Sequence, residues 1–93
     1  MRLGPLLGFE NSFDTLVTVA KEMEAVGAAS VMVAEAGRSA VTQASAVIAA
    51  TNEIEVGTYV VNAFARSPWL TGLTARDLDE MSGGRFVLGV GTG

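Results

Sequence analysis

The sequence predicts an α/β fold, in which parallel strands alternate with helices. Four apolar, β-branched stretches are separated by three segments with helical periodicity, and the connections between them are only a few residues long. Strand–helix–strand units this compact are right-handed, with parallel strands and the helices packed outside the sheet. At 93 residues the chain is long enough for one such domain, spanning residues 1–93.

Apolar runs between turn residues mark the four strands. Their predicted bounds are Arg2–Gly8, Ser30–Ala34, Ile54–Val61 and Phe86–Val90. Pro5 favours an edge position for the first strand, because proline cannot donate a hydrogen bond to a strand ladder. This pattern alone fits two architectures, an open doubly wound sheet and part of a TIM barrel.

The first two helices are bounded by capping residues. Asn11 or Ser12 is expected to cap the start of the first helix, and Gly27 is expected to end it. The second helix is expected over Ala40–Ala50, with Ser39 as its cap. Helical periodicity predicts apolar faces formed by Phe13, Leu16, Val17, Ala20 and Met23 in the first helix, and by Val41, Ala44, Val47 and Ile48 in the second.

The third helix is expected to begin at Ser67-Pro68 and to stop at Gly83-Gly84. Proline is favoured at the first helical position because its missing N–H is not needed there. Trp69 is expected to pack in the first turn. The predicted apolar face of this helix consists of Leu70, Leu73, Thr74, Leu78 and Met81, and the predicted solvated face of Asp77, Asp79 and Glu80.

The composition excludes several classes of function. The net charge is −4 and the Lys and Arg residues do not cluster, so nucleic acid and anionic membranes are not expected partners. The chain has no cysteine and no histidine, which removes thiolate chemistry, the commonest general base and the commonest metal ligands. No apolar run approaches the ~20 residues of a membrane span, and the strand signal begins close to Met1, which leaves no room for a secretory peptide. We therefore expect a soluble, cytoplasmic protein without a metal site.

The chain is 49% hydrophobic and only 17% charged, which is a large apolar share for so short a sequence. Either buried parallel strands use these residues, or some of them meet another chain. A four-stranded sheet has two open edges, here the first and fourth predicted strands, and the fourth carries no charge after Arg85 to discourage pairing. We therefore expect a homo-oligomer, most simply a two-fold dimer.

The second half of the chain carries a specific set of motifs. It contains GT, then N-x-F-x-R-x-P, then LDE-x-SGGR, within the stretch Ile54–Gly93. This stretch closely resembles the third and fourth strands of the bacterial luciferase-like flavin and deazaflavin oxidoreductases. The resemblance extends over essentially all 93 residues but covers only the first part of a family member, which has roughly the 250 residues of a whole barrel. It implies a partial TIM barrel, an N-terminal (βα)3β half-barrel with four parallel strands and three helices.

The resemblance also implies a cofactor, FMN or a deazaflavin coenzyme, at the carboxyl ends of the strands. Glu35 directly follows the second strand, and an acidic residue at the matching place lies beside the cofactor in deazaflavin-dependent relatives. A histidine often follows it there, but Ala36 stands in that place here, so this proton-transfer group is missing. The alternative interpretation of Glu35 is a solvated loop carboxylate paired with Arg38. No catalytic residue is assigned.

Tyr59-Val60-Val61-Asn62 matches the family's third-strand bulge. That bulge commonly contains a cis peptide bond without proline, which backs the flavin-type ring. By position, the cis bond would join Tyr59 to Val60, and Asn62 would be the adjacent polar contact to the ring or to substrate. Tyr59 is larger than the family's usual residue, so its side chain is a candidate to fill part of that space. The alternative is an ordinary strand end.

The last glycines of the chain and two arginines have other interpretations. A phosphate-binding loop needs a helix N-terminus behind it, so Gly89–Gly93 is interpreted as a strand whose glycines let ligand or neighbouring backbone come close. Arg66 is a candidate partner for an anionic group, or for Asp77 or Glu80. Arg85 precedes the fourth strand at the opposite end of the sheet, where we expect a stabilising ion pair.

The resemblance implies hydride transfer or flavin-dependent monooxygenation on a small organic substrate. The 93 residues would hold at most half of such a site, so we expect the isolated chain to be inactive or active only when assembled. The alternative is a self-associating half-barrel that acts as a structural or binding module without catalysis.

Overall fold

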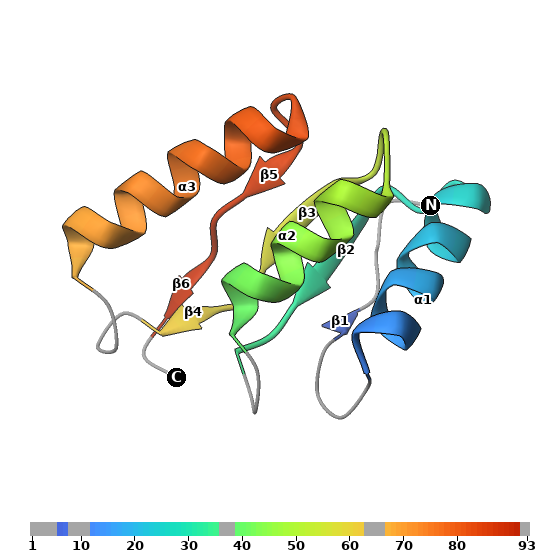
Figure 1. Ribbon diagram of the computed structural model, residues 1–93, viewed down its shortest axis with the longest axis horizontal. Coiled ribbons are helices and arrows are strands. Elements are labelled where there is room, and N and C mark those ends of the chain that lie inside the picture. Colours follow the sequence, from blue (N-terminus) through green and yellow to red (C-terminus); the bar gives the residue numbers. More distant parts are fainter. Residues whose placement is uncertain (1–5, 8–11, 36–38, 63–66, 92–93) are drawn as a thin grey trace.

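The computed structural model describes residues 6–7, 12–35, 39–62 and 67–91 (Figure 1). The elements in chain order are β1 (Leu6–Leu7), α1 (Phe13–Ala25), β2 (Ser30–Val33), α2 (Ala40–Ala50), β3 (Glu55–Thr58), β4 (Val61–Asn62), α3 (Pro68–Ser82), β5 (Phe86–Val87) and β6 (Val90–Gly91). The rest of the first predicted strand lies outside the described residues. No helix in the described ranges is long and apolar enough to cross a membrane.

The predicted α/β fold, with three helices and a parallel sheet, is confirmed. The main sheet has the strand order β1-β2-β3-β5, and every neighbouring pair is parallel. Because consecutive strands are neighbours and parallel crossovers are right-handed, the three helices lie on the same face of the sheet (Figure 1). There α2 packs between α1 and α3.

The predicted bulge in the third strand is confirmed, whereas the continuity predicted for the fourth strand is wrong. The predicted strand Ile54–Val61 is interrupted at Tyr59-Val60, and β3 and β4 are its two parts. The predicted strand Phe86–Val90 is likewise interrupted at Leu88-Gly89 and forms β5 and β6. β4 and β6 pair with each other in a separate two-stranded parallel sheet. The two predicted strands are therefore interrupted at corresponding positions, and their second parts, β4 and β6, leave the main sheet.

The predicted helix starts are confirmed by side-chain caps. The Ser12, Ser39 and Ser67 hydroxyls accept hydrogen bonds from the N–H groups three residues later, at 3.1, 3.3 and 3.0 Å. Each bond satisfies one of the helix's free amide groups. At its other end α3 stops at Gly83, whose left-handed conformation (φ 66°) glycine adopts without steric cost.

The core lies between the helices and the face of the sheet that they cover. Val31 and Val33 of β2 are fully buried there, whereas Met32 between them is only half-buried. Side chains alternate along a strand, so Met32 lies on the opposite face, which no described helix covers. It lies directly over Gly57 of β3, where an added Cβ would be 2.6 Å from the methionine sulfur. The remaining core residues are Leu16, Ala20, Ala40, Ala44, Val47, Ile48, Ile54, Val56, Val61 and Leu78.

The predicted apolar face of α3 is only partly buried. Leu78 is buried and Thr74 half-buried, against α2 and β5. The other three predicted members are exposed: Leu70, Leu73 and Met81. The reason is that α3 ends the row of helices, so nothing described packs on its outer side (Figure 1). Trp69, expected to pack, is 76% exposed. The predicted solvated face is confirmed, since Asp77, Asp79 and Glu80 are all exposed.

Candidate functional site at the carboxyl end of the sheet

The carboxyl ends of β2 and β3 lie side by side. Val33 is in register with Thr58, and the Tyr59 N–H donates to the Val33 carbonyl oxygen at 2.8 Å. The segments that leave these strands are therefore neighbours at the carboxyl end of the sheet. They are Ala34-Glu35 and Tyr59-Val60. The structure thus brings together three of the four residues predicted to bind a cofactor, Glu35, Tyr59 and Val60.

Glu35 is half-buried and holds the start of α2. Its Oε2 accepts a hydrogen bond from the Ala40 N–H at 3.0 Å. A carboxylate is favoured at this position because the N-terminus of a helix carries free N–H groups and partial positive charge. This local contact holds the Glu35 side chain at the carboxyl end of the sheet. The alternative partner Arg38 lies outside the described residues.

Gln43 is a buried polar residue beside Glu35 that the sequence analysis missed. Its side chain is fully buried, and its Nε2 donates to the carbonyl oxygens of Ala34 at 2.8 Å and Ser39 at 3.3 Å. The amide therefore ties the end of β2 to the first turn of α2. Its Oε1 is buried without a hydrogen-bond partner in the part of the chain that the structure describes. A glutamine within the otherwise apolar face of an alanine-rich helix was the signal in the sequence.

The interruption between β3 and β4 exposes one aromatic side chain. The Tyr59–Val60 peptide bond is cis, as predicted. Tyr59 is 65% exposed at the carboxyl end of β3, so its ring does not fill a space within the described chain. Val60 is half-buried, and an added Cβ at Gly91 would lie 2.7 Å from its Cγ2. Val60 therefore packs across β6, while Tyr59 points outward.

A side-chain hydroxyl replaces ladder bonds at this interruption. Thr58 is buried, and its Oγ1 both accepts from the Gly89 N–H and donates to the Gly89 carbonyl oxygen, each at 2.9 Å. The same carbonyl oxygen accepts from the Val61 N–H at 2.8 Å. The Thr58–Gly89 contact thus holds the two interrupted strands together where backbone pairing is broken.

The glycines of β6 and its approach allow close contact, as predicted. A Cβ at Gly89 would collide with the Thr58 carbonyl oxygen, so the two backbones meet directly. Gly91 is in register with Asn62, the fourth predicted cofactor residue. The backbone of Asn62 belongs to β4, and its side chain is outside the description. Its contact to a cofactor stays a prediction.

Arg85 forms a hydrogen-bond network at the amino end of the sheet. Its guanidinium donates to the Ser82 carbonyl oxygen at 2.8 Å, to the Ile54 carbonyl oxygen at 2.8 Å and to Thr51 Oγ1 at 3.0 Å. Longer bonds reach the carbonyl oxygens of Ile48 and Thr51 at 3.3 and 3.2 Å. The expectation of an ion pair is therefore wrong in its partners, because the acceptors are four backbone carbonyl oxygens and one hydroxyl, and two of the carbonyls lie at the end of α2.

Glu24 is the second side chain that bonds to backbone groups at the amino end of the sheet. Its Oε2 accepts from the N–H groups of Asn52, Glu53 and Ile54 at 2.8, 2.6 and 2.9 Å. These bonds, those of Glu53 and Ile54 first, hold the pKa of the Glu24 carboxyl below its usual value, and Arg85 adds a smaller effect. One carboxylate thereby fixes the turn that leads from α2 into β3.

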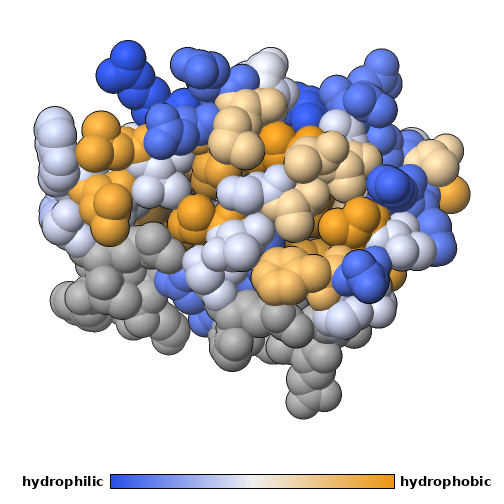
Figure 2. Space-filling model, viewed as in Figure 1, coloured by the Kyte–Doolittle hydropathy of each residue, from blue (hydrophilic) through white to orange (hydrophobic). Residues whose placement is uncertain are grey.

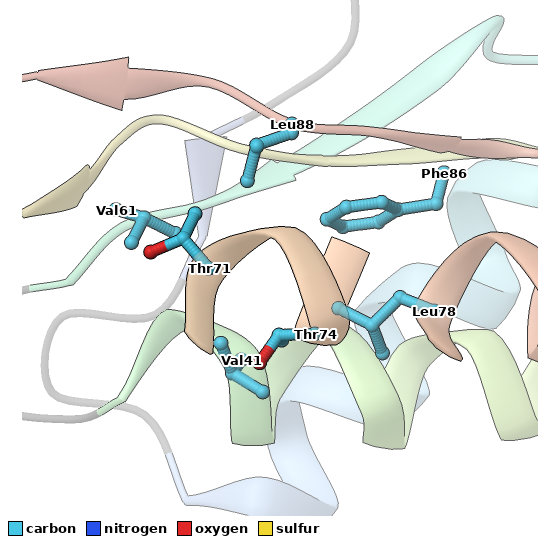
Figure 3. Close-up of a pocket in the computed structure, with 7 residues that line it drawn as sticks. All are labelled: Val41, Val61, Thr71, Thr74, Leu78, Phe86 and Leu88. Carbon is cyan, nitrogen blue, oxygen red and sulfur yellow. The ribbon is translucent and has the colours of Figure 1, made fainter. Parts of the chain in front are cut away.

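A small apolar cavity lies under α3, on the side of the sheet that the helices cover (Figure 3). Side chains from α2, α3 and the strands converge on it: Val41, Val61, Thr71, Thr74, Leu78, Phe86 and Leu88. Its volume is about 10 Å³, the size that holds roughly one water molecule. It has no room for an organic ligand, so it is a packing gap and not a second site.

The described part of the carboxyl end offers an exposed aromatic side chain but no cation. The exposed Tyr59 side chain and the neighbouring Val60 form a surface against which a flat ring, such as that of a flavin, fits. The cations within the described ranges lie elsewhere: Lys21 on α1, Arg76 on α3 and Arg85 at the amino end. Among the described residues, therefore, no cation lies at the carboxyl end. No group of three potential metal ligands occurs among the residues described.

Comparison with known proteins identifies the family. A family model described as luciferase-like monooxygenase matches residues 1–93. The chain belongs to this family. Among curated proteins, it is 44% identical over 43 residues to the 5,10-methylenetetrahydromethanopterin reductase of Methanolobus tindarius, which is 46% of this chain and 13% of the reductase.

Two solved monooxygenase structures share the fold of this chain over part of their length. One is the oxygenating constituent of 3,6-diketocamphane monooxygenase from the CAM plasmid of Pseudomonas putida, a type II Baeyer–Villiger monooxygenase in complex with FMN. It is 20% identical, with a TM-score of 0.85 over 100% of this chain and 30% of its own. The other, monooxygenase RslO1 from Streptomyces bottropensis, is 25% identical, with a TM-score of 0.82 over 97% of this chain and 32% of its own. Both are TIM barrels, and this chain spans about a third of each.

Proposed function

We propose that the chain forms a (βα)3β half-barrel of a luciferase-like oxidoreductase or monooxygenase that uses FMN or a deazaflavin coenzyme. The observation that carries the proposal is the paired interruption of two neighbouring strands, between Thr58 and Val61 and between Val87 and Val90. It opens the carboxyl end of the sheet and leaves Tyr59 exposed there. Ligands of TIM barrels bind at this end.

Four residues would contact the cofactor in this proposal. Tyr59 and Val60 would back its ring, with Asn62 as the polar contact beside it. Glu35, which is hydrogen-bonded to the start of α2, would add negative charge at the carboxyl end of the sheet. When bound, the cofactor would supply the redox chemistry, which is hydride transfer or oxygenation of a small organic substrate.

The isolated chain would be catalytically silent. The sequence contains no histidine or cysteine for proton transfer or nucleophilic attack. No described cation lies at the carboxyl end to hold the cofactor's phosphate. The chain would therefore contribute the ring side of a site whose phosphate side comes from elsewhere.

A titration of the purified chain with FMN, and separately with a deazaflavin coenzyme, tests the proposal. We expect the visible absorbance band of one of the two to shift on binding, because the ring moves from water to an apolar edge. The shift should persist in Tyr59→Phe, which keeps the aromatic ring, and should be lost in Tyr59→Ala. Arg76→Ala, an exposed change on α3, is the matched control and should bind as the unchanged chain does.

Two results would count against the proposal. If neither cofactor's band shifts at millimolar concentration while the chain is folded, the carboxyl end is not a cofactor edge and the alternative of a purely structural module is favoured. If the chain turns over reduced flavin with an organic acceptor, and Glu35→Ala or Asn62→Ala abolishes this, the chain is not silent.

A further inference from the structure

Gln43 is a fully buried polar side chain in the middle helix of the molecule. Hydrophobic side chains reach the surface on the face that carries the helices (Figure 2), whereas Gln43 is buried beneath that face. Because α2 packs between α1 and α3, this position lies away from the outer flanks of the described chain. The contacts of Gln43 therefore do not depend on what packs on the outer sides of α1 or α3.

The Gln43 amide bonds to two backbone carbonyl oxygens. Its Nε2 donates to the carbonyl oxygen of Ala34 at 2.8 Å and to that of Ser39 at 3.3 Å. The reverse orientation of the amide would bring Oε1 against two oxygens that cannot donate, so the nitrogen faces them. Ala34 directly precedes Glu35, and Ser39 directly precedes Ala40. The amide therefore bonds to the peptide group at each end of residues 35–39.

These two peptide groups are the ones that place the Glu35 carboxylate. The first carries Glu35 itself. The second contains the Ala40 N–H, which donates to Glu35 Oε2 at 3.0 Å. A peptide group is planar, so a bond to its carbonyl oxygen also orients its N–H. Gln43 thus orients both the backbone that carries the carboxylate and the donor that the carboxylate binds.

Stability alone does not account for the Gln43 amide. Its Oε1 is buried without a hydrogen-bond partner in the part of the chain that the structure describes, which is unfavourable for folding. The Ser39 carbonyl oxygen also accepts from the backbone N–H of Gln43 at 3.2 Å, so the first turn of α2 closes without the side chain. Among the described contacts, the one that the side chain alone supplies is the bond to Ala34.

We propose that Gln43 is a positioning residue for Glu35: its bond to the Ala34 carbonyl oxygen holds the Glu35 carboxylate at the carboxyl end of the sheet. Without the amide, the peptide group between Ala34 and Glu35 is free to rotate, and the carboxylate leaves the Ala40 N–H. That the carboxylate then faces a cofactor ring rests on the proposed function. Its position in the cofactor-free chain does not.

Amide hydrogen exchange of the cofactor-free chain, measured by NMR, tests the positioning. In Gln43→Met the Ala40 N–H should exchange about tenfold faster, because it loses its carboxylate acceptor. Glu35→Ala should have the same effect, and the double variant should match either single variant. The Thr42 N–H in the same turn is bonded to Ser39 Oγ and should exchange at an unchanged rate in all three.

Ser45→Ala is the matched control. It removes another side-chain hydrogen bond of α2, from Ser45 Oγ to the Val41 carbonyl oxygen at 2.9 Å, and should leave Ala40 exchange unchanged. A second measurement needs no substitution of Gln43 and applies even if Gln43→Met does not fold. The side-chain N–H protons of Gln43 should stay protected from exchange in Glu35→Ala, because Glu35 depends on Gln43 and not the reverse.

The absorbance band of bound FMN or deazaflavin gives a readout that a loss of stability does not move. A charge beside the ring changes the position of the band, so Glu35→Ala should displace the band of the saturated chain. Gln43→Met should displace it in the same direction, and the double variant should show this displacement once and not twice. Ser45→Ala should leave the band in place.

Four results would overturn the proposal. Unchanged Ala40 exchange in Gln43→Met would show that Glu35 stays in place without the amide. Equal acceleration of Ala40 and Thr42 would show that the substitution only loosens the turn. Loss of Gln43 side-chain protection in Glu35→Ala would reverse the dependence. A band that Glu35→Ala displaces and Gln43→Met does not would separate the two residues. If neither cofactor binds the unchanged chain, the proposed function fails and the exchange rates alone decide the role of Gln43.

Discussion

The two ends of the parallel sheet are built differently. At the amino end, Arg85 and Glu24 together make eight hydrogen bonds, nearly all to backbone groups at the ends of α2 and β3. At the carboxyl end the strands are interrupted, Tyr59 is exposed and Gln43 Oε1 has no partner in the described chain. The comparison indicates that side-chain hydrogen bonds hold the amino end together, whereas the carboxyl end is open, as the proposed cofactor site requires.

Removal of Arg85 should have the largest effect on stability. Arg85→Met keeps most of the apolar stem but leaves up to four backbone carbonyl oxygens without their donor. Unsatisfied buried acceptors cost about 1–3 kcal/mol each, and since Arg85 is only half-buried we expect a total loss of about 3 kcal/mol. Urea denaturation measures it. Arg76→Met, on the exposed surface of α3, should change stability by less than about 0.5 kcal/mol; equal losses in the two variants would refute the role of the amino end.

Thr58 should matter less, because it bridges a single interruption. Thr58→Val preserves the shape of the side chain but removes the hydroxyl that bonds both backbone groups of Gly89. We expect a loss of about 1–2 kcal/mol, because the Gly89 N–H loses this acceptor, whereas the Gly89 carbonyl oxygen keeps its bond from the Val61 N–H. Thr58→Ser keeps the hydroxyl and should recover most of the difference. If valine and serine are equivalent in chemical denaturation, the Thr58–Gly89 contact does not hold the interrupted strands together.

The smallest effect is expected at Glu24, and it depends on pH. Because the folded chain lowers the pKa of this carboxyl, its contribution is complete above the ordinary value of 4.5 and is lost as pH falls through the lowered value. Glu24→Gln should cost about 1 kcal/mol at neutral pH, after allowance for solvent screening of a half-buried group. The difference between the variant and the unchanged chain should shrink in acid. Glu22→Gln, an exposed neighbour on α1, is the control, and a Glu24 effect that grows on acidification would contradict this assignment.

Local features were predictable from the sequence. Each serine cap and the stop of α3 at glycine depend on residues within one helical turn, so Ser39 and Ser67 were identified and Ser12 was one of two candidates. Apolar runs located the strands but did not give their bounds. The order of parallel strands followed from short right-handed connections. The family resemblance added the cis bond at Tyr59–Val60.

The remaining features depend on contacts between distant parts of the chain. Glu24 binds amides 28–30 residues away, and the acceptors of Arg85 outside its own turn are 31–37 residues away. No local periodicity encodes such pairs. The interruption between β5 and β6 was missed, and the residue that Gly89 contacts there, Thr58, is 31 positions away in the sequence. Periodicity identified the apolar side of α3 but not that Leu70 and Leu73 on it remain 49% and 40% exposed.

The central claim is that the amino end of the sheet stabilises the fold and the carboxyl end binds the cofactor. It is tested most directly by measuring the thermal unfolding midpoint with and without saturating FMN. Binding to the folded state raises the midpoint, so the unchanged chain should gain several degrees with FMN. Tyr59→Ala should have the unchanged midpoint without ligand and lose the gain, whereas Arg85→Met should melt many degrees lower and keep the gain. A Tyr59→Ala variant that melts as low as Arg85→Met, or that keeps the full gain from FMN, would contradict the account.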